Sequence, residues 1–500
     1  MFGKNISYSE KKLILTQFIY GYYYFYHSIM EIITEFKYIH DCIHGYIPIS
    51  NVAYMIINTP EFQRLRYIKQ LGTCIYAFPN ANHCRFSHSI GTYHLAGEIL
   101  ASIIKKGNMD VINNYLGSIK ELEHYFSGKC EGKYVLDNYV CELVKIAALC
   151  HDLGHGPFSH VFDDIYLARH KDGNPRYSHE ERSKIILENI ISKNKYLSEC
   201  ISKHELEFIK NIIDPNNDNI GFIYQIVSNS YNGIDVDKFD YITRDCYILG
   251  LKNGFDYEGL VKHAYISNIN IEYPEKLLYE IKKMFDARYS LHKQIYSHKT
   301  VISAQIMMTE LFEIIDPVLN LSKSVDDMEY FCKLTDEYIL NCIDHRLELY
   351  RELSLNNIIY YDYIDRLDKA KTILDNLNNH NMYRLVSQHL CDSDNLYVKI
   401  DDYMNLDDFD PKYIDKIIIY NTKIGFVSGN KNNPMDNIHS SPYYYTGYKK
   451  IYIGNISNIT PNVYQEYISM VYTNSKEDGD IEKIKKWSTQ INIANSGKNL

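Results

Sequence analysis

The stretch Cys150-His151-Asp152-Leu153-Gly154-His155-Gly156-Pro157-Phe158-Ser159-His160 combines an adjacent His-Asp pair with two more histidines and two glycines. The run before it, Val140 to Cys150, is mostly apolar at helical spacing and predicts a buried helix that ends at a polar site. The glycines and the proline break that helix and turn the chain. Imidazoles and carboxylates gathered on one rigid element are typical ligands of a borderline metal ion. The stretch therefore predicts a metal site at the end of a buried helix.

The apolar and charged fractions are those of an ordinary globular protein, and the chain is long enough for a large core. The chain has 500 residues, of which 45% are apolar and 23% charged, and one large domain with a smaller lobe is expected. A net charge of −10 argues against bulk binding to a phosphate backbone. Eleven scattered cysteines without a C-x-x-C pair predict reduced thiols in an intracellular chain. The cytoplasm is the expected compartment, with the nucleus as the alternative.

The N-terminal extension, residues 1–34, contains a segment that resembles a membrane span in length. Leu13 to Met30 carries no formal charge, which is about the length of a spanning helix. Its many tyrosines, together with Gln17 and His27, make it only moderately apolar. We expect a helix that packs on the domain or on a partner subunit, and no membrane association.

Patterns along the first 400 residues predict a mainly α fold. Thr59 and Pro60 are a favourable N-cap and first helical residue, and Ser178 is a second N-cap. The expected elements are a strand and turn at Phe36–Ile49, helices at Phe62–Gln70 and from Arg85, a surface excursion with one short helix at Lys105–Asn138, one long helix at Ile281–Ile315, and helical character to about Val386.

After about residue 395 the composition shifts, and we expect a small α+β lobe. Asn432-Asn433-Pro434 is a turn signal. The expected elements of the lobe are a strand pair at Tyr413–Phe426, strands at Tyr443–Tyr445 and Lys450–Ile453, a helix at Val463–Tyr472 and a frayed end at Asn474–Leu500.

Three separate helices are expected to supply one metal site. His88, the pair His151-Asp152, and Asp237 offer two imidazoles and two carboxylates. Side chains that project from several helices toward a buried centre are the usual way to build a metal site in a helical protein. The ligand types leave Zn, Fe, Mn and Ni open.

These residues resemble a known family. Arg85-Phe86-Ser87-His88, His151-Asp152 and Asp237 are similar to the H…HD…D pattern of HD-domain phosphohydrolases. Thr59 through Arg66, Cys150 through His160, and Asn232 through Asp245 resemble the sterile-alpha-motif and HD-domain-containing deoxynucleoside triphosphate triphosphohydrolases. The resemblance runs from about Phe36 to about Tyr472. It implies an HD-domain helical core at residues 35–394, an α+β lobe at 395–500, and no sterile-alpha-motif domain in residues 1–34.

The family's reaction cuts a dNTP, dGTP included, into a deoxynucleoside and inorganic triphosphate, with one divalent transition metal (Zn, Fe or Mn) at the HD site and Mg²⁺ on the triphosphate. The resemblance implies that His155 and His179 lie near the α-phosphate, and that His160 is the general acid, oriented by Asp163. The implied metal ligands are His88, His151, Asp152 and Asp237. The implied substrate contacts are Gln70, Leu71, Arg85, Lys238, Tyr241, Asp245, Arg288 and Tyr296.

In the family, an activating nucleotide binds between subunits of a homo-oligomer, a dimer or tetramer. Residues that match parts of those sites are Lys37, Asn58, Gln63, Arg66, Lys276 and Arg384. Asn58 replaces an aspartate, and an amide has a different set of donors and acceptors. Gly259 and His380 stand where arginines are expected, Thr473 and Asn474 where lysines are expected, and Ser297 where a glutamine near the base is expected. The resemblance therefore implies an active enzyme with altered or absent GTP activation.

Two other functions stay open at the level of sequence. One is an HD phosphohydrolase that acts on another nucleotide, but Gln70, Asp245 and Tyr296 argue for a dNTP. The other is a nucleic-acid-binding module, and the net acidity argues against it as the main role. Single-stranded nucleic acid is therefore expected only as a secondary partner.

Overall fold

The computed structural model describes residues 36–170, 174–252, 254–266, 268–354, 360–391, 393–426, 433–438, 440–441 and 464–496. The N-terminal extension and the two strands expected at Tyr443–Tyr445 and Lys450–Ile453 lie outside these residues. Within them, no helix combines the length and the apolar character needed to cross a bilayer.

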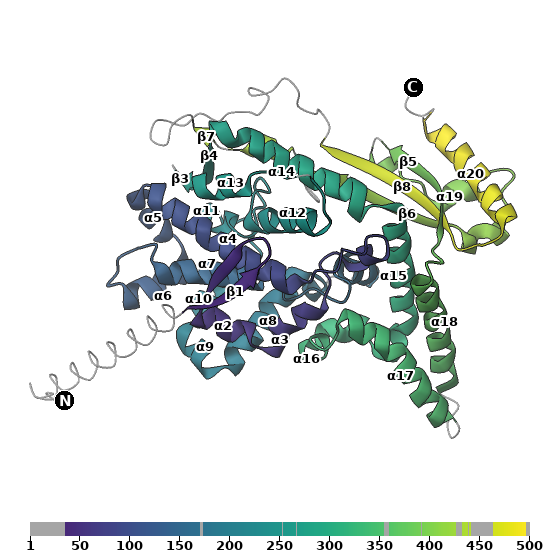
Figure 1. Ribbon diagram of the computed structural model, residues 1–500, viewed down its shortest axis with the longest axis horizontal. Helices are drawn as coiled ribbons and strands as arrows, with labels where there is room; N and C mark the ends of the chain where they lie inside the picture. Colours follow the sequence, from purple (N-terminus) through teal and green to yellow (C-terminus); the bar gives the residue numbers. More distant parts are fainter. Residues whose placement is uncertain are drawn as a thin grey trace, which may run out of the picture.

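A layered helical core occupies the first half of the chain (Figure 1). The helix α4 lies at its centre, packed against α7 on one side and α12 on the other. The helices of this half are α2 (Asn51–Ile57), α3 (Pro60–Gln63), α4 (Arg85–Lys106), α5 (Met109–Leu116), α6 (Lys120–Lys129), α7 (Asn138–Cys150), α8 (His179–Lys193), α9 (Lys195–Cys200), α10 (Lys203–Ile213), α11 (Phe222–Gln225) and α12 (Val236–Ile248).

The second half continues the helical core toward a C-terminal lobe. The long helix α15 packs against α18 and reaches the strand β5 of that lobe. The helices here are α13 (Tyr257–His263), α14 (Leu278–Leu291), α15 (Lys299–Leu319), α16 (Met328–Phe331), α17 (Asp336–Ser354), α18 (Tyr360–Asn378), α19 (Ile400–Met404) and α20 (Asp478–Ser496).

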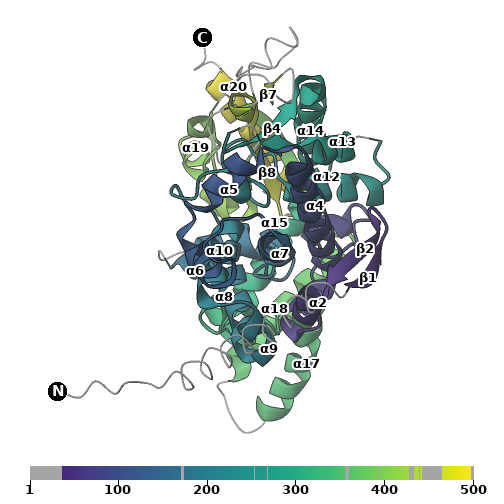
Figure 2. The same cartoon turned by 90° about the vertical axis from the view of Figure 1, so that its left-hand side faces the viewer.

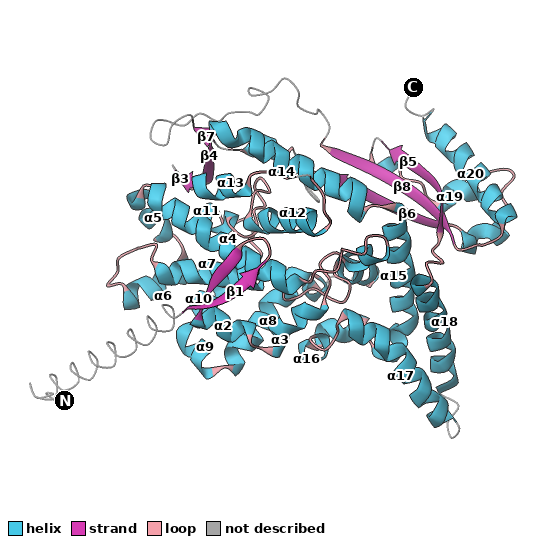
Figure 3. Cartoon of the chain, in the orientation of Figure 1, coloured by secondary structure: helices cyan, strands magenta, loops and turns pink. Residues whose placement is uncertain are grey.

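In the part of the chain that the structure describes, three small sheets accompany these helices (Figure 3). The hairpin β1–β2 is antiparallel, β3–β4–β7 has an antiparallel and a parallel pair, and β5–β8–β6 is antiparallel with β8 in the middle. Figure 2 shows the β1–β2 hairpin at the edge of the core, beside α4. The strands are β1 (Phe36–Asp41), β2 (Gly45–Ser50), β3 (Tyr265–Ile266), β4 (Ile271–Pro274), β5 (Arg384–Cys391), β6 (Ile418–Gly425), β7 (Ser440–Ser441) and β8 (Gln465–Thr473).

The predicted mainly α fold with a small α+β lobe is confirmed, and so are several local signals. The Thr59 hydroxyl caps α3 by accepting from the Phe62 backbone N–H, and Ser178 caps α8 in the same way from Glu181. Arg85 begins α4 as expected. The apolar run before the HD pair is α7, whose residues Val140, Leu143, Val144, Ala147 and Cys150 are fully or almost fully buried.

Three predictions for the core are wrong in detail. The helix expected to reach Gln70 gives way to a 3₁₀ turn at Arg64–Tyr67, because residues 68–70 pair with residues 83–85 instead. The surface excursion at 105–138 holds two helices, α5 and α6. The helix expected at Ile281–Ile315 is interrupted by a π-helical turn at His292–Tyr296, after which His298 caps α15.

The lobe differs more from its prediction. The expected helix at Val463–Tyr472 is the strand β8, and the expected strand pair at Tyr413–Phe426 is a 3₁₀ turn followed by β6. The end expected to be frayed is α20, which buries Ile484, Trp487 and Ile491. Helical character ends at Asn378, before β5. The domain boundary at residue 394 stays a prediction, although β5 precedes it and pairs with β8 of the lobe.

Candidate active site

The turn that follows α7 lies against the first turn of α8 because residue 154 is glycine. A Cβ at Gly154 would lie 2.1 Å from the His179 carbonyl oxygen and 2.5 Å from the Ser183 backbone nitrogen. The Gly154 N–H donates to the Ser183 hydroxyl at 2.8 Å. A larger residue would push the two elements apart. This contact brings His179, the first residue of α8, beside the His-Asp pair.

The end of the same turn is held in an unusual backbone conformation. Phe158 and Ser159 have φ values of 57° and 55°, a left-handed region that costs a non-glycine residue about 1–2 kcal/mol. The Phe158 N–H donates to Asp336 at 2.7 Å, and the Ser159 hydroxyl donates to the Lys69 carbonyl at 2.7 Å. Such strain persists where neighbours fix it, and here it lies immediately before His160.

The four predicted metal ligands converge from α4, the end of α7, and α12. Nε2 of His88 lies 3.2 Å from Oδ1 of Asp237 and 3.5 Å from Oδ2 of Asp152. Nε2 of His151 lies 3.6 Å from Oδ1 of Asp237 and 3.4 Å from Oδ1 of Asp152. Two imidazoles and two carboxylates thus face one point.

The orientation of both imidazoles fits a divalent metal. Nδ1 of His151 lies 2.8 Å from the Ala148 carbonyl, and Nδ1 of His88 lies 2.8 Å from Asp240. Each Nδ1 therefore carries the ring proton and leaves the Nε2 lone pair toward the carboxylates. Nε2 of His151 is buried and has no hydrogen-bond partner in the described part of the chain. A divalent ion would satisfy that lone pair.

The electrostatics of the cluster also suit a cation. Burial lowers the pKa of His88, but hydrogen bonds to Asp237 and Asp240 outweigh it and raise this pKa to about 10, so that without metal the ring is an imidazolium whose Nε2 proton a divalent ion would replace. Burial alone would raise the pKa values of Asp237 and Asp152. The neighbouring His151 and His88 hold the pKa of Asp237 below its usual range, and the charges of Arg85 and His151 do so for Asp152. Both carboxylates are therefore anionic near neutral pH, as metal ligation requires.

His155 and His179 form a stacked pair beside these ligands, with ring centroids 3.9 Å apart. Nδ1 of His155 lies 2.6 Å from Oδ2 of Asp163, whose other oxygen forms an ion pair with the buried Arg182. Burial and the neighbouring His155 lower the pKa of His179 to about 3. Asp152, His155 and His179 also form a second group whose ligand atoms lie within 4.8 Å of one another.

The predicted pairing of Asp163 with His160 is wrong. Asp163 pairs with His155, and the partner of His160 is Asp164, with Nδ1 2.8 Å from Oδ2. Residues 161–166 form a π-helical turn, which is wider than an α-helix, and the residue four positions after His160 is the one that faces it. The missed residue, Asp164, directly follows the expected Asp163. Its i, i+4 spacing from His160 was the signal available in the sequence.

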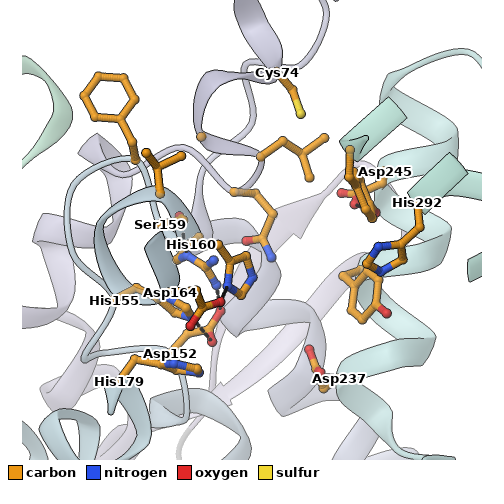
Figure 4. Close-up of a pocket in the computed structure, with 18 of the residues that line it drawn as sticks. Cys74, Asp152, His155, Ser159, His160, Asp164, His179, Asp237, Asp245 and His292 are labelled. Atoms are coloured by element: carbon orange, nitrogen blue, oxygen red, sulfur yellow. Dashed lines mark hydrogen bonds and ion pairs between the residues drawn. The ribbon is translucent and has the colours of Figure 1, made fainter. Parts of the chain in front are cut away.

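One cavity of about 460 Å³ joins these groups. Figure 4 shows Asp152, His155, His160, Asp164 and His179 on one side of it, with Asp237, Asp245 and His292 on the other. The residues predicted to contact substrate all line this cavity, namely Gln70, Leu71, Arg85, Lys238, Tyr241, Asp245, Arg288 and Tyr296. Three of the four predicted metal ligands, His151, Asp152 and Asp237, therefore line the cavity together with the predicted substrate contacts, although these residues are far apart in the sequence.

Most polar side chains of the cavity wall are held by neighbours. Arg85 donates to Asp152 at 2.6 Å, Lys238 pairs with Asp235 at 2.9 Å, and Arg288 donates to the Gly425 carbonyl of β6. The Tyr296 hydroxyl donates to Asp245, which also lies 2.7 Å from Nε2 of His83. These contacts fix where cations and hydroxyls face the cavity.

Part of the wall was not predicted from sequence. The lobe strand β6 contributes Tyr420, Thr422 and Lys423, and the interrupted helix contributes His292 and Gln305. Burial, with the charge of Arg288, keeps the pKa of His292 well below its usual range, so this ring is neutral. The packing of the lobe on α15, through Ile302 and Tyr472 among others, and the contact of Arg288 with Gly425 bring β6 here.

None of the six residues considered for an activating nucleotide lines the cavity. Arg66 donates to Gln63 at 2.7 Å and lies over the Phe86 ring, while Asn58 is the C-cap of α2. Lys37 is in β1, Lys276 is in the 3₁₀ turn before α14, and Arg384 is in β5. Their predicted role is not tested by these positions.

Comparison with known proteins agrees with the geometry. Residues 130–244 match the family model of the HD domain, which takes in the His151-Asp152 pair and Asp237. The chain is 38% identical over 399 residues to the putative HD domain-containing protein L394 of Acanthamoeba polyphaga mimivirus, with 78% of this chain and 82% of that protein covered.

Two further relatives carry a more specific description. The chain is 31% identical over 446 residues to the deoxynucleoside triphosphate triphosphohydrolase SAMHD1 homolog of Dictyostelium discoideum, with 88% of this chain and 78% of that protein covered. It is 34% identical over 406 residues to the deoxynucleoside triphosphate triphosphohydrolase SAMHD1 of Homo sapiens, and spans 58% of that protein's length. With its HD site and these relatives, the chain belongs to the SAMHD1-type deoxynucleoside triphosphate triphosphohydrolases, a family of hydrolases.

Proposed function

We propose that this chain hydrolyses dNTPs, dGTP among them, to a deoxynucleoside and inorganic triphosphate. One observation carries the proposal. The cluster of His88, His151, Asp152 and Asp237 adjoins a single cavity that contains every side chain expected to contact a dNTP. A phosphohydrolase needs this combination of a Lewis-acid site and a cationic cavity.

The four ligands would hold a divalent transition metal, Zn, Fe or Mn, which when bound supplies Lewis acidity and acidifies water near neutral pH. Asp152 and Asp237 provide the anionic ligands, and the two histidines provide Nε2 lone pairs fixed by acceptors at Nδ1. We further propose that Mg²⁺ accompanies the triphosphate.

Phosphate charge is neutralised by groups from different parts of the fold. Arg85, Lys238 and Arg288 are held at the cavity by partners on neighbouring elements. Fixed cations that face the phosphates need no reorganisation during the reaction, which is where most of their catalytic benefit lies. His155, His179 and the Tyr241 hydroxyl line the same region.

His160 is the proposed general acid that protonates the departing 5′-oxygen. It lines the cavity, and Asp164 holds its Nδ1 side at 2.8 Å, so that Nε2 faces outward as the donor. The surrounding cavity walls act to lower the pKa of His160, but the hydrogen bond and charge of Asp164 raise it above the usual value. A raised pKa keeps the imidazole protonated near neutral pH, as an acid catalyst requires.

The sugar is positioned by the pair Tyr296 and Asp245. The Tyr296 hydroxyl donates to Asp245, and Gln70 lines the cavity on the chain segment beside them. A ring fixed in this way leaves room for a deoxyribose and excludes a 2′-hydroxyl. A carboxylate with an open lone pair accepts a hydrogen bond from the 3′-hydroxyl.

We also propose that GTP activation is altered or absent, and that the chain works as a homo-oligomer. Thr473, one of the residues in place of a lysine, is fully buried in β8, and Gly259, in place of an arginine, has no side chain to offer a phosphate. The loss of several cations weakens a polyphosphate site.

Purified protein should therefore be assayed with each dNTP, with and without GTP, by following the release of inorganic triphosphate. Turnover without GTP, abolished by Asp237→Asn, is the expected result. Strict dependence on GTP would contradict the regulatory part. Absence of turnover with Zn²⁺, Fe²⁺ and Mn²⁺ would contradict the catalytic part, and release of orthophosphate or pyrophosphate would indicate another nucleotide chemistry.

A further inference from the structure

A buried carboxylate connects the metal ligand His88 to the β1–β2 hairpin. Asp240 lies one turn after Asp237 on α12 and is fully buried. Its Oδ2 is 2.8 Å from Nδ1 of His88, and its Oδ1 is 2.7 Å from Nε2 of His44, in the turn of the hairpin. One carboxylate therefore fixes a metal ligand on one side and is itself fixed by the hairpin on the other.

A buried arginine ties the same carboxylate to the hairpin a second time. Arg244 donates to Asp240 through Nε at 2.8 Å and Nη2 at 2.9 Å. It also donates to Asp41, the last residue of β1, through Nη1 at 2.8 Å and Nη2 at 3.2 Å. Asp41 in turn accepts from the backbone N–H groups of Ile43 and His44. The turn of the hairpin and the end of β1 are thus bonded to α12.

The helix that carries His88 leaves space for this arrangement. Gly91 is on α4, three residues after His88, and a Cβ there would lie 1.9 Å from Oδ1 of Asp240 and 2.6 Å from Nη2 of Arg244. Any side chain at position 91 would displace the carboxylate from the metal ligand. The close approach of α12 to α4 thus depends on a glycine next to the metal site.

We propose that the β1–β2 hairpin is a positioning element for the metal centre, in which His44 and Asp41 hold Asp240 and Asp240 orients His88. A carboxylate at Nδ1 fixes the tautomer and the ring angle of a metal-bound histidine and raises its basicity, and loss of such a partner typically lowers metal affinity by about 10–100-fold. The relevance to catalysis rests on the proposed function, but the effect on metal binding does not.

The coupling is reciprocal. If the hairpin strengthens metal binding through Asp240, bound metal must stabilise the hairpin by the same free energy. The hairpin also carries Lys37, one of the residues considered for an activating nucleotide. A ligand that orders β1 would therefore raise metal affinity along this route.

The test compares the effects of substituting two neighbouring histidines, His44 and His94, on metal affinity. His44→Phe removes the hydrogen bond to Asp240, whereas His94→Phe alters a ring whose centroid lies 5.3 Å from that of His44 and which forms no described hydrogen bond to Asp240. Mn²⁺ and Zn²⁺ affinities are measured without nucleotide by competition with a chelator. We expect a loss of about tenfold or more for His44→Phe and a wild-type value for His94→Phe.

A second measurement separates positioning from a purely structural role. Hydrogen exchange of the wild-type amides at residues 36–50 should slow when Mn²⁺ is added, and Asp41→Asn should reproduce the affinity loss if His44→Phe does not fold. Wild-type metal affinity in the folded His44 or Asp41 variant would overturn the proposal. Hydrogen exchange of the hairpin amides that does not change when metal is added would also overturn it. If the wild-type chain hydrolyses no dNTP while His44→Phe still weakens metal binding, the proposed function fails and the positioning role stands.

Discussion

Nδ1 of His160 lies 2.8 Å from Oδ2 of Asp164, so this cavity histidine is paired with the second of two adjacent aspartates. The first, Asp163, points the other way and pairs with His155 and Arg182. The two neighbours therefore serve different histidines, and their substitutions should have different effects.

Asp164→Asn should lower kcat by about 100-fold or more, the usual contribution of a positioned acid. Without the carboxylate the pKa of His160 falls, because Asp164 is what raises it. The alkaline limb of the pH–rate profile should therefore move to lower pH. A profile identical to that of the wild type would remove Asp164 from the mechanism.

Asp163→Asn is the matched comparison. The substitution leaves the buried guanidinium of Arg182 without its anion, and breaking such a pair typically costs about 3–5 kcal/mol. We expect a large loss in the free energy of unfolding, measured by urea titration, whereas Asp164→Asn, whose side chain is 61% exposed, should unfold close to the wild type.

Removal of metal should lower thermal stability as well as activity. A ligand bound only by the folded state adds about 2.7 kcal/mol at a concentration of 100 times Kd. The Tm of chelator-treated protein should rise when Mn²⁺ or Zn²⁺ is restored, and Asp237→Asn should show little of this rise. A Tm that does not respond to any divalent ion would contradict the assignment of the four ligands.

Tyr296→Ala should relax discrimination between dNTP and rNTP. Removal of the ring opens the space beside Asp245, and a cavity that excludes an extra hydroxyl by shape alone discriminates by about 100-fold at most. The ratio of kcat/KM for dGTP over GTP should fall by about tenfold or more. Tyr420→Phe, which alters a cavity tyrosine on β6, should leave the ratio unchanged.

Stability should depend on pH through Asp336. Burial raises the pKa of this carboxyl from 3.8 to about 7, although the backbone N–H groups of Phe158 and Lys69 act to lower it. Between these values the folded state keeps a proton that the unfolded state has lost. The free energy of unfolding therefore falls as pH rises from about 4 to about 7, by at most about 1.4 kcal/mol per pH unit.

Urea titrations of the wild type and Asp336→Asn between pH 4 and 8 would measure this contribution. The free energy of unfolding of the wild type minus that of Asp336→Asn should fall as pH rises to about 7 and then level off. Parallel curves would show that Asp336 has an ordinary pKa in the folded state.

The proposed metal ligands could be picked out because each sits in a motif with its own local signal, whereas the proposed substrate contacts followed from the resemblance to the family. His88 opens a helix, His151-Asp152 ends one, and Asp237 stands in the first turn of another. These residues come together as soon as the three helices that carry them pack against one another. The partner of His160 was missed because the resemblance indicated Asp163, while Asp163 and Asp164 are both within helical reach of His160 and only the observed π-helical turn decides between them.

The lobe was harder to predict for a different reason. The central strand β8 is buried on both faces from Ile468 to Thr473, so it lacks the alternation that distinguishes a strand from a buried helix. For α20 the signal existed, since Ile484, Trp487 and Ile491 fall on one helical face. The surrounding polar residues concealed it. The contribution of β6 to the cavity followed from tertiary packing alone.

The most direct test of the central claim is hydrolysis of dGTP by the metal-loaded protein in ¹⁸O-labelled water, with both products identified by mass spectrometry. The account predicts unlabelled deoxyguanosine and inorganic triphosphate that carries one ¹⁸O, because water attacks the α-phosphorus and the 5′-oxygen leaves. Label in the deoxyguanosine, or release of pyrophosphate or orthophosphate in place of triphosphate, would contradict it.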